Sequence, residues 1–171
     1  PPAPSAAAAP ASDADMGVGD GVGEGGDARG SAPGDDDAAR RLFVGLGPAC
    51  RAASTMALVG ALLKQPFDDV RIACYALLEA ACAQPGAWGV RAVLSAPGAL
   101  EQLTSGADSE STADAKVAKF AVLQAAWAGG GDAAVARLSS VGAGVAARVR
   151  ERVLAGPYAV RTAAPTVMTE A

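Results

Sequence analysis

The stretch QPFDDVRIACYALLEAACAQP, residues 65–85, is a helix-sized apolar segment that lies between two prolines. Its apolar residues recur at the spacing of one helical face and form a continuous stripe along Val70, Cys74, Leu77, Leu78 and Ala81. Asp68 and Asp69 fall in the first turn, where acidic side chains interact favourably with the helix dipole. We therefore predict one amphipathic helix from Phe67 to Gln84.

A second line of residues runs along the same predicted helix. Arg71, Tyr75 and Glu79 recur at intervals of four, so they share a face beside the apolar stripe. Such a line can border a binding groove, or it can form a ladder of contacts to the next helical unit. The sequence leaves both interpretations open, and it suggests that Asp69 pairs with Arg71 along the stack.

The rest of the chain after residue 38 predicts further short helices, separated by proline and glycine. We expect them at residues 38–46, 49–64, 87–95, 97–104, 113–128, 132–139 and 144–155. No segment alternates polar and apolar residues with the period of a strand. Because helical bundles usually have longer helices, we predict an all-α fold, an armadillo/HEAT-like α-solenoid fragment with a disordered N-terminal segment.

The helix expected at residues 113–128 carries its own signals. Ser111 to Asp114 resemble a capping box with aspartate as the acceptor. Lys116 and Lys119 are expected on or beside the solvent-facing side. The opposite face is predicted to hold Val117, Phe120, Ala121, Gln124 and Trp127.

The composition divides the chain into three parts. Residues 1–38 form an Ala/Gly/Asp-rich segment of low complexity that we expect to be disordered, because it has too little apolar surface to offset its ordering entropy. Residues 39–155 form the predicted helical-repeat domain, and residues 156–171 form a C-terminal tail. Since the chain lacks an initiator methionine, we interpret it as a fragment or a processed form.

Charge follows the same division. Residues 1–37 hold eight acids and one base, whereas residues 38–171 hold ten acids and thirteen bases. The basic excess of the folded part is too small and too scattered for a nucleic-acid footprint. The longest apolar run, residues 56–63, is far shorter than a membrane span. We therefore expect neither nucleic acid nor membrane as a partner.

Several classes of chemistry are excluded by the residues themselves. The sequence has no histidine, which removes serine–histidine and cysteine–histidine nucleophile pairs and the HExxH zinc motif. It also has no phosphate-binding loop of the GxxxxGK[ST] type. The three cysteines, Cys50, Cys74 and Cys82, lack metal-ligand spacing, so we predict buried free thiols. We expect no enzyme activity, no cofactor and no metal.

A family resemblance rests on segments in a fixed order. Residues 66–78, PFDDVRIACYALL, look like the second helix of a HEAT repeat. The segments PFDDVRIACYALLEAACAQPGAW, SAPGALEQL, ADAKVAKFAVLQAA and AGPYAV together resemble the C-terminal region of the proteasome non-ATPase regulatory subunit 5 family. The resemblance covers residues 65–171. It departs from the family pattern at SAPG, which has an inserted alanine, and at Ala159, where the family has a second tyrosine.

The resemblance implies a fold of armadillo/HEAT-type repeats and a chaperone that assembles the base of the proteasome regulatory particle. Members of the family bind ATPase subunits through the C-terminal domains of those subunits, in cytoplasm and nucleus. The alternative is a generic HEAT/armadillo interaction scaffold unrelated to the proteasome. Candidate partner-binding residues lie in and after the last predicted helix: Arg148, Arg150, Arg152 and Tyr158. The three arginines can instead form a solvated face, and Tyr158 can instead seal the last pair of helices.

Overall fold

The computed structural model describes residues 33–106 and 109–159, and within these ranges it contains α-helices and no β-strand. The helices are α1 (Pro33–Ala49), α2 (Thr55–Leu62), α3 (Asp68–Cys82), α4 (Trp88–Leu94), α5 (Ala99–Thr104), α6 (Ala113–Ala126), α7 (Gly131–Ser139) and α8 (Val145–Ala155). The predicted all-α, α-solenoid-like class is confirmed. None of the described helices combines the length and the hydrophobicity that a membrane-spanning segment needs.

Helix α1 differs from its prediction at both ends. It begins at Pro33, within the segment predicted to be disordered, and it continues through Pro48 to Ala49. Proline is accepted at the first helical position because the N–H that it lacks has no helical partner there. Pro48 lies in the last turn, where it removes one helical hydrogen bond without ending the helix earlier. Residues 1–32 of the predicted head, and residues 160–171 of the predicted tail, lie outside the described residues.

The junction between α1 and α2 is fixed by one buried hydroxyl. Thr55 donates a hydrogen bond to the carbonyl oxygen of Phe43 and accepts one from the N–H of Gly47 at 3.1 Å. A Cβ at Gly47 would lie 2.2 Å from the carbonyl carbon of Ser54, so the backbones approach closely there. Ser54 caps α2 by accepting from the N–H of Ala57. Helix α2 therefore begins at Thr55, later than the predicted residue 49.

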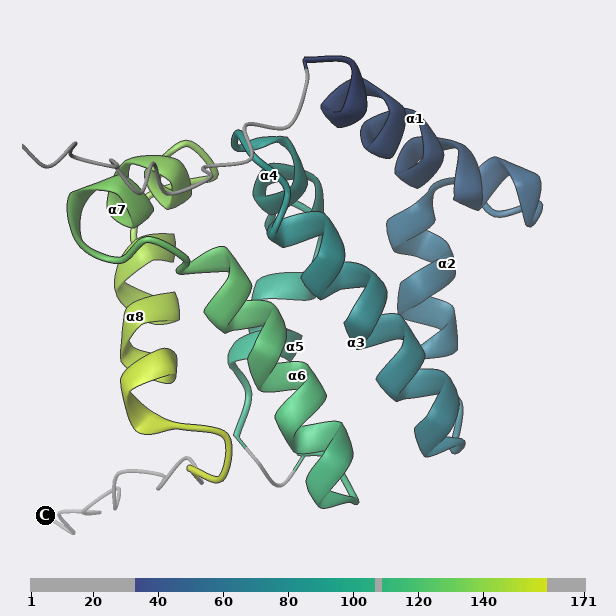
Figure 1. Cartoon of the computed structure of the whole chain (residues 1–171). Coiled ribbons are helices and arrows are strands. Elements are labelled where there is room, and N and C mark those ends of the chain that lie inside the picture. Colours follow the sequence, from purple (N-terminus) through teal and green to yellow (C-terminus); the bar gives the residue numbers. More distant parts are fainter. Residues whose placement is uncertain (1–32, 107–108, 160–171) are drawn as a thin grey trace, which may run out of the picture. The chain divides into compact units, whose positions relative to one another are not determined.

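Helices α3 and α6 form the centre of the described structure and make its most extensive helix–helix contact (Figure 1). Helix α3 also contacts α1, α2 and α4, while α6 also contacts α5 and α8. Three of the contacts join helices three places apart along the chain: α3 with α6, α4 with α7, and α5 with α8. This regular offset is the layered stacking expected of an α-solenoid.

The core runs along these stacked helices. Its largest fully buried side chains come from α2 to α8: Val59, Tyr75, Leu78, Cys82, Val90, Val93, Leu103, Val122, Leu123, Leu138 and Val149. Helix α4 reaches α3 through Gly89, because a Cβ there would lie 1.7 Å from the carbonyl oxygen of Ala81. The predicted apolar stripe of α3 is largely confirmed, since Cys74, Leu78 and Ala81 are buried.

The predicted orientation of α6 is wrong. Its buried residues are Ala115, Lys119, Val122, Leu123 and Ala126. Val117 is exposed, as is Gln124, although both were assigned to the apolar face. The helix is rich in alanine, so the periodicity of its few large side chains does not identify the face that packs on α3.

The predicted capping box before α6 is also wrong. Thr112, rather than Ser111, is the N-cap residue, and its hydroxyl accepts from the N–H of Ala115 at 3.3 Å. The hydroxyl of Ser111 instead contacts α3, where it donates to Asp68 at 2.9 Å. Helix α5 likewise begins at Ala99 after a left-handed Gly98, so Pro97 precedes the helix and does not open it.

Candidate functional site

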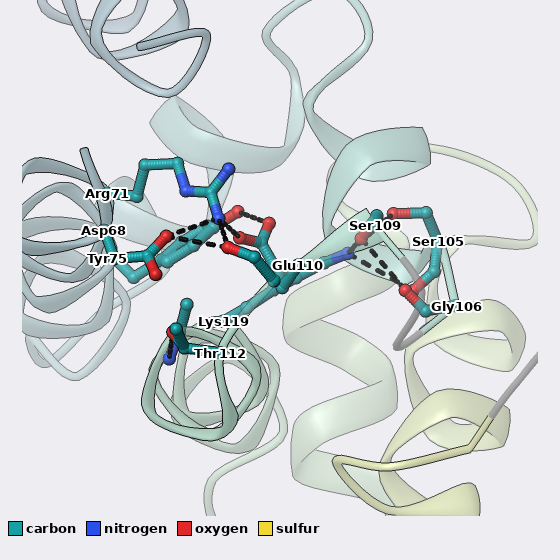
Figure 2. Close-up of polar contacts among 11 residues, drawn as sticks. Asp68, Arg71, Tyr75, Ser105, Gly106, Ser109, Glu110, Thr112 and Lys119 are labelled. Atoms are coloured by element: carbon teal, nitrogen blue, oxygen red, sulfur yellow. Dashed lines mark hydrogen bonds and ion pairs between the residues drawn. The ribbon is translucent and has the colours of Figure 1, made fainter. Parts of the chain in front are cut away.

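A polar network joins α3 to the connection that precedes α6 (Figure 2). At its centre, the guanidinium of Arg71 contacts Asp68 of its own helix at 2.8 Å and Glu110 at 3.0 Å. The same Arg71 donates a hydrogen bond to the hydroxyl of Ser111 at 2.9 Å. The side chain of Glu110 is only 5% exposed, so the carboxylate is held by partners in the protein rather than by water.

Tyr75 completes this network from one turn further along α3. Its hydroxyl donates to Oε1 of Glu110 at 2.5 Å, and the residue is completely buried. Burial, together with the hydrogen bond to Glu110, raises the pKa of Tyr75 far above its ordinary value. The phenol therefore remains protonated at neutral pH and acts as a hydrogen-bond donor, not as a base.

The network differs from the expected pairing of Asp69 with Arg71. For the line of Arg71, Tyr75 and Glu79, it favours a ladder between helical units over the border of a binding groove. Asp69 is exposed, and the partners of Arg71 are Asp68 and Glu110. Arg71 and Tyr75 form a ladder to the unit that contains α6, whereas Glu79 is exposed and takes no part in the network. The ladder therefore positions α6 on α3.

A second polar group lies next to the first. The ammonium of Lys119 donates to the hydroxyls of Ser105 and Ser109, both at 2.6 Å, and to the carbonyl oxygen of Ser105 at 3.3 Å (Figure 2). Lys119 is 3% exposed, so the expectation that it lies on the solvent side is wrong. Its aliphatic stem is buried with the packed face of α6, and its ammonium lies among the oxygens of Ser105 and Ser109 in the connection after α5.

Ser109 and Glu110 connect the two groups as neighbours in sequence. Through them, the segment between α5 and α6 is tied to α6 by Lys119 and to α3 by Arg71. Sequence reasoning missed both Glu110 and Lys119 as structural contacts. Glu110 lies in a polar stretch without a recognisable motif. Lys119 lies in an alanine-rich helix whose sequence gives no sign that the lysine is buried.

The four predicted partner-binding residues do not form one surface. Arg148 contacts Glu101 at 3.0 Å and Thr104 at 3.2 Å, so it bridges α8 to α5. Arg152 donates to the carbonyl oxygens of Gly156 at 2.7 Å and Pro157 at 3.4 Å, beyond the end of α8. Arg150 is exposed, and Tyr158 is 59% exposed. Two of the four therefore hold the fold together, and two face solvent.

A groove of about 1130 Å³ lies between the α1–α2 pair and helix α4. Its apolar lining comes from three helices and includes Phe43, Met56, Ala57, Gly60, Trp88 and Ala92. The rings of Phe43 and Trp88 meet edge to face, with centroids 6.0 Å apart. Three basic residues also line the groove: Arg40, Lys64 and Arg91. Sequence reasoning did not single out this surface.

The cysteines are free thiols, as predicted, but one of them is not buried. Cys74 and Cys82 are buried and Cys50 is exposed. Burial raises the pKa of both Cys74 and Cys82, and that of Cys82 reaches about 12. In the described part of the chain, no group of three or more cysteine and carboxylate side chains could hold a metal ion.

The fold and these contacts define a class: an all-α, α-solenoid-like protein in which polar ladders and apolar packing hold successive helical layers together. The chain belongs to the family described as proteasome non-ATPase 26S subunit, whose model matches residues 48–171. The match begins within the last turn of α1 and includes α2 to α8. No curated protein and no solved structure matches the chain.

Proposed function

We propose that this protein is a non-catalytic chaperone for assembly of the base of the proteasome regulatory particle. The observation that carries the proposal is the family match over residues 48–171, combined with an α-solenoid-like fold. Solenoids present extended surfaces made of many short helices, and such surfaces suit protein partners. Within the family, the ordered segments from PFDDVR to GPYAV favour the regulatory subunit 5 type.

The proposed partners are the ATPase subunits of the regulatory particle, bound through their C-terminal domains in the cytoplasm and the nucleus. The polar ladder between α3 and α6 supports a binding role over a catalytic one. Its tyrosine remains protonated at neutral pH, and its carboxylate and arginine are occupied by each other. A catalytic acid or base needs a pKa near the working pH and access to its substrate.

Capture from cell extract tests the proposal. The tagged full chain should recover free regulatory-particle ATPases together with little mature proteasome, because an assembly chaperone leaves before the particle is complete. Partners unrelated to the proteasome would favour the generic HEAT/armadillo scaffold instead. Recovery of intact 26S particles in proportion to the ATPases would indicate a resident subunit and would contradict the chaperone role.

A further inference from the structure

The groove between the α1–α2 pair and α4 has a floor that belongs to the core and a rim that faces solvent. Phe43 and Thr55 in its lining are buried, whereas Val44, Ala57 and Ala61 are exposed. Its volume of about 1130 Å³ exceeds the range of about 300–1,000 Å³ typical of small-molecule pockets. Its walls are two helices, α2 and α4, with α1 at one end. This is the geometry in which an amphipathic helix of another protein lays its apolar face into a groove.

The charges around the groove select one kind of partner. Arg40, Lys64 and Arg91 line it and are exposed, and no acidic residue is among the lining residues. Among the side chains that the structure describes, none of these three bases forms an ion pair. A negative partner would therefore meet positive charge from α1, from the connection after α2 and from α4 together.

The lining also offers space for a bound segment. A Cβ added at Gly60 meets nothing within 4 Å, so the α2 wall is open there.

We propose that this groove binds an amphipathic helical segment of a partner protein, with an apolar face against Val44, Met56 and Trp88 and acidic residues opposite Arg40, Lys64 and Arg91. The inference does not depend on which protein supplies the segment. It therefore stands or falls separately from the role in proteasome assembly.

The test uses the full chain and two fluorescein-labelled helical peptides of about four turns. Both have leucine at i, i+3, i+4 and i+7; one has glutamate at the remaining positions and its twin has lysine. Fluorescence anisotropy should show that the glutamate peptide binds and that the lysine peptide binds at least about tenfold more weakly. Adding salt should weaken binding of the glutamate peptide, because exposed charges are screened.

Two variants locate the binding. Replacing Arg40, Lys64 and Arg91 together by glutamate should weaken binding of the glutamate peptide at least about tenfold. Gly60→Leu adds a side chain where a Cβ meets nothing within 4 Å, on the α2 wall of the groove, and should block both peptides. The matched control is Arg51→Glu with Lys116→Glu, at one exposed and one half-buried base outside the groove, and should change binding by less than about threefold.

Each other outcome would overturn the proposal. Equal binding of the two peptides would show that charge does not select the partner, and unchanged binding by Gly60→Leu would place the site elsewhere. If the free chain dimerises and Gly60→Leu abolishes the dimer, the groove would be assigned to a second copy of the chain. If a peptide of residues 1–32 displaces the probe at a lower concentration than the unlabelled glutamate peptide does, the groove would be assigned to this chain's own acidic N-terminal segment. Absence of peptide binding, in a chain that shows its normal helical circular dichroism, would also contradict the proposal.

Discussion

The hydroxyl of Tyr75 donates a hydrogen bond of 2.5 Å to the carboxylate of Glu110, across 35 residues of sequence. Arg71 approaches the same carboxylate at 3.0 Å from the same helix. A carboxylate that precedes α6 is thus held by two residues of α3, both on the face that turns away from solvent. The contact is between successive helical layers, so its strength bears on how firmly α6 is held on α3.

The ion pair between Arg71 and Glu110 should contribute strongly to stability and should do so as a unit. Arg71→Met leaves a buried carboxylate without its cation and should lower the free energy of unfolding by about 3–5 kcal/mol. The double variant Arg71→Met, Glu110→Leu should lose less than the sum of the two single variants, with a coupling of about 1–3 kcal/mol. Urea denaturation of the four proteins measures this coupling.

The exposed pair Arg41–Asp37 is the control for this double-mutant comparison, since its side chains are 74% and 59% exposed. The corresponding cycle of Arg41→Met and Asp37→Asn should show a coupling below about 1 kcal/mol. If the single losses at Arg71 and Glu110 were additive, the ladder would not be the link between α3 and α6 that the distances indicate.

Two helix glycines should respond oppositely to the same substitution. Gly89→Ala places a methyl group against the carbonyl oxygen of Ala81, which forces α4 away from α3 and should cost about 1–3 kcal/mol or more. Gly60→Ala meets open space and should stabilise α2 by about 0.5–1 kcal/mol, because alanine has the higher helix propensity. Thermal unfolding followed by circular dichroism compares them. Equal effects of the two substitutions would refute the close approach of α4 to α3.

Alkaline pH should destabilise the protein through its buried thiols. The pKa of Cys82 is raised from an ordinary value of 9.0 to about 12, so the unfolded chain loses this proton at a lower pH than the folded chain does. The stability contributed by this thiol is complete below pH 9.0 and falls as the pH rises toward about 12, by up to about 1.4 kcal/mol per pH unit. The buried Tyr75, whose pKa is also raised, adds to the loss in the same direction.

Urea denaturation in reducing buffer across this pH range measures the dependence. Cys82→Ala should make the fall with pH shallower, whereas Cys50→Ala at the exposed thiol should leave the slope unchanged. The comparison uses slopes, because removing a buried side chain lowers stability at every pH. An unchanged slope in Cys82→Ala would show that this thiol ionises equally easily in the folded and unfolded chain.

The four candidate partner-binding residues should separate into two groups. Arg152→Ala removes the contacts with Gly156 and Pro157 beyond the end of α8, which should lower the free energy of unfolding by about 1 kcal/mol. Arg150→Glu and Tyr158→Ala change exposed side chains and should leave stability within about 0.5 kcal/mol. If the C-terminal end of the solenoid contacts the partner, these two variants should reduce capture of ATPase subunits. Capture equal to that of the unchanged chain would remove this end from the interface.

The sequence predicts the helices well because glycine and proline mark nearly every boundary. Helices α3 to α8 all lie within two residues of their predicted limits. It does not predict which face of α6 is buried, because that helix is rich in alanine and Lys119 is held by oxygens from another segment. The role of Glu110 rests on its contacts with Tyr75 and Arg71, and no local sequence pattern relates residues so far apart. The groove is assembled from three helices, so its charge pattern is visible only once they pack.

The central claim is that this chain binds regulatory-particle ATPases, and equilibrium binding to their isolated C-terminal domains tests it most directly. Isothermal titration calorimetry of the full chain against each domain in turn should show one or more of them binding with a dissociation constant in the micromolar range or tighter, roughly −8 kcal/mol. The mature 26S particle should not bind the chain, because an assembly chaperone leaves before the particle is complete. Failure of every folded domain to bind a folded chain would contradict the account.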